Sequence, residues 1–185
     1  DYYLSLGGGE VADVIGYHFY LDEAPEALAT WYIPSVWAIL AARGQASKPL
    51  WNTEGGYLRL TVPGPKTLSD DLGAAYLART YLLNWASGVS RFYFYAWDNH
   101  TTTNIELTAA DNTTLTVAGV AYRELAGWLL GAQLTDLRVD DSDAWILSFN
   151  QPAGDRAHIV WHPSAPLTFD LPAAWNVQSL RTLAG

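Results

Sequence analysis

The sequence predicts an α/β protein in which a parallel sheet covered by helices is followed by a small antiparallel β module. Apolar segments rich in β-branched and aromatic residues alternate three times with segments of helical periodicity. From residue 132 the pattern changes to short strands separated by turns that contain Asp, Pro and Gly. Because strand–helix alternation with such apolar strands is typical of a parallel sheet, we assign residues 1–131 to this part and residues 132–185 to the β module.

The first unit is predicted from "VADVIGYHFY", residues 11–20, an apolar run that indicates a strand buried on both faces. Apolar positions at helical spacing predict a helix over residues 26–43. We expect Pro34 to begin or kink this helix and Gly44 to end it.

The second unit starts with "PLWNTE", residues 49–54, which predicts a short strand that the two following glycines break. The helix of this unit is expected to run to about residue 87. Thr67 or Ser69 can cap it, because their hydroxyl groups accept hydrogen bonds from the first free backbone N–H groups.

The third unit and the β module follow. "SRFYFYAW", residues 90–97, predicts a strand, residues 98–116 a long polar loop, and residues 117–130 a helix. The strands expected in the β module are residues 133–139, 144–149, 156–162, 166–170 and 176–182.

Composition excludes several classes of function. The net charge of −9 argues against a nucleic-acid partner and against docking on an anionic membrane surface, and no apolar run is long enough to span a bilayer. The sequence has no cysteine and no His/Asp/Glu cluster with metal-ligand spacing, so we predict no metal and no cofactor. It also has no methionine and begins with Asp1, so we expect a processed product or part of a longer protein.

The carboxyl ends of the three predicted strands carry side chains that can bind a ligand. In a parallel sheet these ends lie side by side, and functional groups gather there. Taken singly, Glu54 also fits a solvated loop residue, and His18 a buried core histidine. Their occurrence on neighbouring strand ends favours a site. The candidate residues are His18, Tyr20, Asn52, Glu54, Trp97 and Asp98.

Three segments, "DVIGYHFY", "KPLWNTEGGY" and "FYFYAWDN", resemble in this order the last three strands of a retaining glycoside hydrolase. The resemblance is to the (β/α)8 barrels of clan GH-A, with family 39 or a family 5-like relative as the nearest type. It covers nearly the whole chain. It implies that residues 1–131 are the C-terminal part of a barrel and that residues 132–185 are part of a β-sandwich.

The resemblance also implies roles for the candidate residues. The strand-seven motif W-x-T-E-x-G matches Trp51, Thr53 and Glu54, which makes Glu54 the catalytic nucleophile. His18 and Tyr20 would contact this nucleophile or the sugar, and Trp97 would line the sugar site. The substrates implied are β-linked sugars such as xylosides or glucosides. We add Asn52 and Asp98 as substrate-binding residues.

The sequence departs from this family in one important respect. A retaining glycosidase needs two carboxyl groups about 5–5.5 Å apart, and a complete barrel has about eight strands over roughly 250 residues. The clan's acid/base is a Glu after an Asn, and no Asn-Glu pair occurs here. Asp22 and Asp98 are the other acids at the strand ends. We therefore expect the acid/base to be missing from this chain, and the open strand edges to pair with further copies or with a missing barrel half.

Three hypotheses follow. The first is a retaining glycoside hydrolase, or a fragment of one, with a carbohydrate substrate. The second is a non-catalytic carbohydrate-binding or structural fragment that self-associates through its open strand edges. The third is a scaffold whose strand edges bind a protein partner.

Overall fold

The computed structural model describes residues 1–62 and 64–185 and confirms the predicted α/β class. It contains a parallel three-stranded sheet, in the order β1-β2-β3, and an antiparallel three-stranded sheet, in the order β4-β5-β6. The strands are β1 (Ile15–Leu21), β2 (Leu50–Tyr57), β3 (Val89–Phe94), β4 (Gln133–Val139), β5 (Trp145–Asn150) and β6 (Arg156–Trp161).

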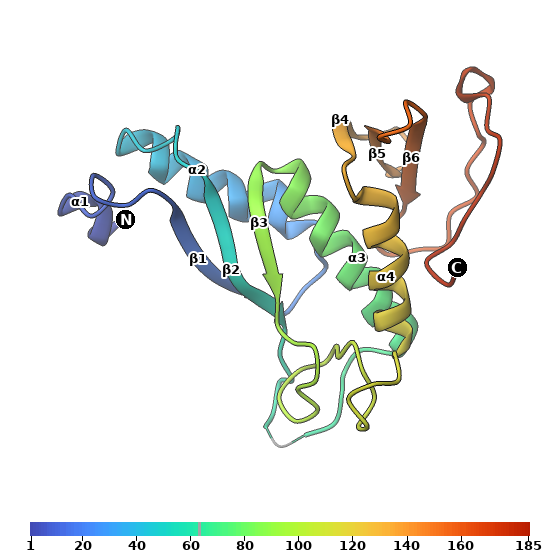
Figure 1. The fold of residues 1–185 in the computed structure, drawn as a ribbon, viewed down its shortest axis with the longest axis horizontal. Coiled ribbons are helices and arrows are strands. Elements are labelled where there is room, and N and C mark those ends of the chain that lie inside the picture. The colour runs from blue at the N-terminus through green and yellow to red at the C-terminus, as the bar shows by residue number, and fades with distance from the viewer. Residues whose placement is uncertain (63) are drawn as a thin grey trace.

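Helices follow each parallel strand, as predicted, and lie on one side of the parallel sheet (Figure 1). Ser69 and not Thr67 caps α3, since its hydroxyl accepts the N–H of Leu72 at 3.3 Å. Within the described ranges, no helix is both long and apolar enough to cross a membrane. The helices are α1 (Tyr2–Ser5), the π-helical turn η1 (Leu28–Tyr32), α2 (Ile33–Ala42), α3 (Asp70–Ala86), α4 (Val117–Leu129) and the 3₁₀ turn η2 (Ala173–Trp175).

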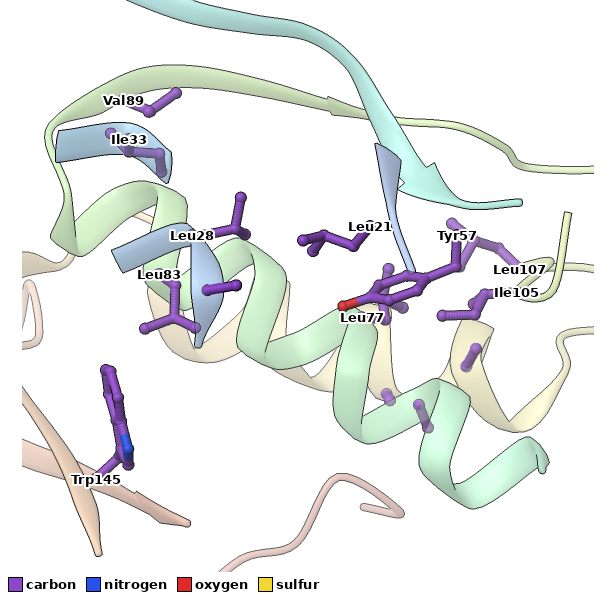
Figure 2. Packing of buried hydrophobic residues seen from close by; sticks show 14 of the residues in the cluster. Leu21, Leu28, Ile33, Tyr57, Leu77, Leu83, Val89, Ile105, Leu107 and Trp145 are labelled. Atoms are coloured by element: carbon purple, nitrogen blue, oxygen red, sulfur yellow. The ribbon is translucent and has the colours of Figure 1, made fainter. Parts of the chain in front are cut away.

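Helix α3 lies between the two sheets and is buried on two sides. Leu77 and Leu83 of α3 face the parallel sheet, where they belong to the cluster shown in Figure 2. On the other side, Ala78 and Leu82 of α3 pack with Leu147 of β5. The parallel sheet and the β module therefore share α3 as a common core element, and burial of this apolar surface is the main stabilising force.

The glycines after Glu54 do not break β2, and the expectation that they would was wrong. The strand continues to Tyr57, and both glycines are buried. A Cβ on Gly55 would lie 2.7 Å from the carbonyl oxygen of Phe19, and one on Gly56 would lie 2.2 Å from that of Tyr95. The glycines are thus needed because neighbouring backbone approaches β2 closely, and they do not leave open space for a ligand.

The C-terminal segment also differs from expectation. The predicted strands at 166–170 and 176–182 are not formed, and η2 is the regular element of this segment. Pro166, at the start of the first segment, has no N–H to donate to a strand ladder, and Pro172 lies between the two segments. The segment instead contacts β6 through side chains: the ring of Trp175 stacks on His158 with 3.9 Å between centroids.

The close contact at Gly56 gives a test of this packing. We expect Gly56→Ala to lower the free energy of unfolding by about 2 kcal/mol or more, because the methyl group meets a backbone atom that cannot rotate away. Gly127 is the matched control: it lies in α4 and a Cβ there meets nothing within 4 Å. Gly127→Ala should raise stability by up to about 1 kcal/mol through helix propensity. Denaturant unfolding of both variants measures the difference, and equal effects would contradict this packing.

Candidate functional site

A register shift between β1 and β2 sets the direction of the Glu54 side chain. Tyr17 pairs with Asn52, but the next residue, His18, pairs with Glu54, so Thr53 has no partner in β1. Side chains alternate between the two faces of a strand, and an extra residue reverses the alternation. Glu54 therefore shares a face of the sheet with His18, whereas an unshifted register would turn it toward the helices.

The carboxylate of Glu54 is held by Tyr20. The phenol hydroxyl of Tyr20 donates a hydrogen bond to Oε1. Nδ1 of His18 lies 3.9 Å from Oε2, which is longer than a hydrogen bond. The Glu54 side chain is 38% exposed and that of His18 is 59% exposed, so a ligand can reach both.

The surroundings of Tyr20 keep its phenol protonated. Burial raises its pKa above the ordinary tyrosine value, and the hydrogen bond to the Glu54 carboxylate raises it further. The ring of Tyr95 packs edge-on against Tyr20, with 6.2 Å between centroids. The Tyr95 hydroxyl in turn accepts a hydrogen bond from Nδ2 of Asn99 at 2.7 Å. Tyr20 is thus a fixed, neutral donor to Glu54.

Trp97 and Asp98 lie just beyond the carboxyl end of β3. The backbone carbonyl of Trp97 accepts hydrogen bonds from the N–H groups of Leu107, at 3.0 Å, and Thr108, at 3.1 Å. Its indole is half exposed, and Asp98 and Asp22 are exposed. The Trp97 backbone is therefore anchored while its ring remains accessible.

The side chains of His18, Tyr20, Glu54, Trp97 and Asp98 lie at or just beyond the carboxyl ends of the parallel strands, which we call the rim. Asn52 is not at this rim. It is 1% exposed, and its Nδ2 donates to Oδ1 of Asn84 in α3 at 3.3 Å. The Tyr17 hydroxyl donates to the same oxygen at 3.3 Å. Because Asn52 precedes the register shift, it faces the helices, and its amide joins β2 to α3 instead of contacting a ligand.

A cluster of three charged side chains, Arg59, Lys66 and Glu106, was not predicted from the sequence. Glu106 is 3% exposed, and its carboxylate pairs with Arg59 at 3.2 Å and with Lys66. No pattern in the sequence indicated it, because a charged residue between Ile105 and Leu107 is typical of an exposed position. In the described ranges, no group of three or more His, Asp and Glu residues is placed to hold a metal ion.

The face of the parallel sheet opposite the helices carries Trp51, Arg91 and Tyr93, which we call the open face. The guanidinium of Arg91 lies over the Trp51 ring, 4.8 Å from its centroid. The ring centroids of Trp51 and Tyr93 are 6.3 Å apart. Arg91 and Tyr93 are exposed. Within residues 1–62 and 64–185, β1 and β3 each have one strand neighbour, so the sheet also has two free edges.

One cavity lies away from Glu54. It has a volume of about 540 Å³ and lies between α2, the end of α3 and β4, where Trp37, Leu134 and Leu137 line it. The predicted site residues do not contribute to it. We place the candidate site at the rim around Glu54, because that is where accessible polar groups converge.

Comparisons with known proteins show what this fold is similar to. No protein-family model matches the sequence, and neither does any curated protein. Among solved structures, the chain is similar to a glucosidase from Croceicoccus marinus, with a TM-score of 0.61 and 19% identity, over 83% of this chain and 34% of the glucosidase. The chain thus spans about a third of that enzyme, and the likeness shows a shared fold.

A second group of similar structures comes from Amycolatopsis mediterranei. A GH128 (subgroup I) endo-β-1,3-glucanase in complex with laminaritriose gives a TM-score of 0.47 and 24% identity, over 68% of this chain and 51% of the glucanase. The E199Q form of this glucanase in complex with laminarihexaose gives a TM-score of 0.47 and 23% identity, over 67% of this chain and 50% of the glucanase. The chain spans about half of this enzyme.

Buried tyrosines predict a loss of stability at alkaline pH. Burial raises the pKa of Tyr17, Tyr57 and Tyr81 above the ordinary value of about 10. The stability that comes from keeping these phenols neutral is complete below pH 10 and is lost as the pH rises beyond it. We expect tyrosinate absorbance to appear together with the loss of circular dichroism. Gradual ionisation in a protein that keeps its helices would contradict this prediction.

Proposed function

We propose that the chain is part of a retaining glycoside hydrolase, of the clan GH-A type represented by family 39 or a family 5-like relative. Its substrates would be β-linked sugars such as xylosides or glucosides. The observation that carries this proposal is the accessible Glu54 carboxylate at the carboxyl end of a parallel strand, with Tyr20 donating a hydrogen bond to it. The shared fold with a glucosidase supports it.

In this proposal Glu54 attacks the anomeric carbon and the aglycone leaves with the bond electrons. A covalent glycosyl-enzyme forms, which water then hydrolyses. Tyr20 orients the attacking carboxylate, and its raised pKa keeps the donor proton in place. His18 is near enough to contact the sugar beside Glu54, Trp97 offers its ring as a stacking surface, and Asp98 offers a carboxylate to sugar hydroxyls.

Departure of a poor leaving group needs a second carboxyl group as proton donor. The exposed acids at this rim, Asp22 and Asp98, lie on loops outside the strands. We propose that the acid/base comes from a polypeptide that completes the barrel. An activated aryl glycoside bypasses this need, because its aglycone leaves without protonation.

The open face and the two free strand edges support the idea that further strands complete the sheet. Edges of this kind are normally paired or covered, and an aromatic face with a single cation is suited to contact with another protein layer. The completing strands would come from further copies of the chain or from the rest of a barrel.

The nucleophile can be tested with a fluorinated aryl β-glycoside that traps the glycosyl-enzyme. We expect one sugar per chain, attached to Glu54 and detected by mass spectrometry of peptides. Glu54→Gln should abolish labelling, because an amide oxygen is a poor nucleophile. Glu23→Gln, at an exposed position in the loop after β1, is the matched control and should label like the wild type.

A different outcome would favour the second hypothesis, a carbohydrate-binding fragment. If the wild type releases no aglycone but binds oligosaccharides saturably, and Trp97→Ala removes that binding, the rim is a binding site without turnover. The half-exposed Trp97 ring is the observation that supports this alternative.

Self-association can be measured by sedimentation. We expect the chain to form dimers or larger assemblies through its free strand edges, and Tyr93→Arg, in the edge strand β3, to shift it toward the monomer by placing a second cation beside Arg91. Tyr3→Arg, at an exposed position in α1, is the control and should leave the mass unchanged. A wild-type monomer at all concentrations would show that copies of the chain do not complete the sheet.

A further inference from the structure

Arg59 joins the loops that follow β2 and β3. Its Nε donates to the carbonyl oxygen of Thr103 at 2.9 Å and its Nη2 to that of His100 at 2.8 Å. Its Nη1 donates to the carbonyl oxygen of Gly64 at 2.8 Å, and its own backbone N–H to that of Thr102 at 2.8 Å. One side chain thus holds the carbonyl groups of two loops that are far apart in the sequence, and Figure 1 shows these loops together below the strands.

A buried carboxylate fixes the position of Arg59. Oε1 of Glu106 accepts a hydrogen bond from Arg59 at 3.2 Å, and Oε2 pairs with Lys66. The side chains of Arg59 and Glu106 are only 14% and 2% exposed. Loss of Glu106 would leave the largely buried Arg59 guanidinium without its counter-ion, which is costly, so Glu106 favours this position of Arg59.

A series of contacts through Asn99, Tyr95 and Tyr20 connects the loop held by Arg59 to Glu54. Oδ1 of Asn99 accepts the N–H of Thr102 at 2.9 Å, which ties the Asn99 side chain to the part of the loop that Arg59 binds. Nδ2 of Asn99 donates to the Tyr95 hydroxyl at 2.7 Å. The Tyr95 ring packs edge-on against Tyr20, and Tyr20 donates to Glu54.

We propose that Arg59 is a positioning residue for the Glu54 site. It acts through Asn99 and Tyr95, which set the position of the Tyr20 ring and so the direction of the hydrogen bond to Glu54. The catalytic consequence rests on the proposed function, since it assumes that Glu54 reacts with a sugar. The structural part, from Arg59 to Tyr20, stands on the contacts alone.

The structural part is tested by nuclear magnetic resonance on the full chain. Arg59→Met removes every side-chain donor, and Tyr95→Phe removes one hydroxyl group. We expect both to shift the ring resonances of Tyr20, and Arg59→Met also to speed amide exchange in residues 98–104 by at least about tenfold, because the loop opens more often. Arg123→Met is the control, since this exposed arginine pairs with Glu124 on the surface of α4. If Arg59→Met does not fold, Tyr95→Phe alone decides.

The catalytic part is tested by the rate at which the fluorinated aryl β-glycoside labels Glu54. We expect Arg59→Met and Tyr95→Phe to lower the saturating rate by about ten- to a hundredfold, with a smaller change in the half-saturating concentration, because misplacement affects the reacting geometry more than binding. The double variant should be no slower than Arg59→Met, since both act on one path.

The outcomes separate the two proposals. Unchanged Tyr20 resonances in Tyr95→Phe, with wild-type labelling of Glu54, would overturn the positioning role and leave the glycosidase proposal intact. No labelling of the wild type, with the expected shifts at Tyr20, would overturn the glycosidase proposal and leave the structural role of Arg59 supported.

Discussion

The shift of register between β1 and β2 is the constraint on which the site depends. It leaves Thr53 without a partner and turns the next side chain, Glu54, to the face that carries His18 and Tyr20. The hydroxyl of Thr53 donates to the carbonyl oxygen of Tyr17 at 3.1 Å, so the irregular position is stabilised at the point where it occurs. Without the extra residue, Glu54 would point into the layer between the sheet and α3, where a carboxylate is costly and unreactive.

The helices on the other side of the parallel sheet join it to the β module. Helix α3 is buried between both sheets, and a buried ion pair adds a link where they meet. Nη1 of Arg79, in α3, lies 3.0 Å from Oε1 of Glu26, and the Trp161 indole of β6 donates to the same oxygen at 2.8 Å. Arg79 also donates to the carbonyl oxygen of Pro163 at 3.0 Å. The loop after β1 is therefore tied to the β module, so residues 1–131 and 132–185 pack as neighbours with a shared core.

Apolar periodicity and parallel topology predicted β1 to β6, the main helices, and the position of His18, Tyr20 and Glu54 at neighbouring strand ends. The sequence did not predict the place of Asn52. Thr53, which has no partner in β1, places Asn52 and Glu54 on opposite faces of the sheet. No residue pattern in the sequence indicates this shift of register. The glycines after Glu54 were ambiguous for a similar reason: they fit both an open loop and a close backbone approach.

Other features depend on contacts between distant segments, which local patterns do not contain. Residues 166–170 and 176–182 have strand-like composition, yet they form no ladder, and side-chain stacking between Trp175 and His158 holds this segment instead. Glu106 lies in a loop that composition marks only as polar. Its role depends on Arg59, which is 47 residues away in the sequence.

The most direct test of this account is the carbon-13 chemical shift of the Glu54 side-chain carboxyl group at neutral pH, assigned with Glu54→Gln. The account predicts that Tyr20→Phe moves this resonance, because the phenol donates to the carboxylate, and that Tyr93→Phe, on the same face, leaves it in place. A Glu54 resonance that is the same in the wild type and in Tyr20→Phe would contradict the placement of Glu54 on which the site and its proposed chemistry depend.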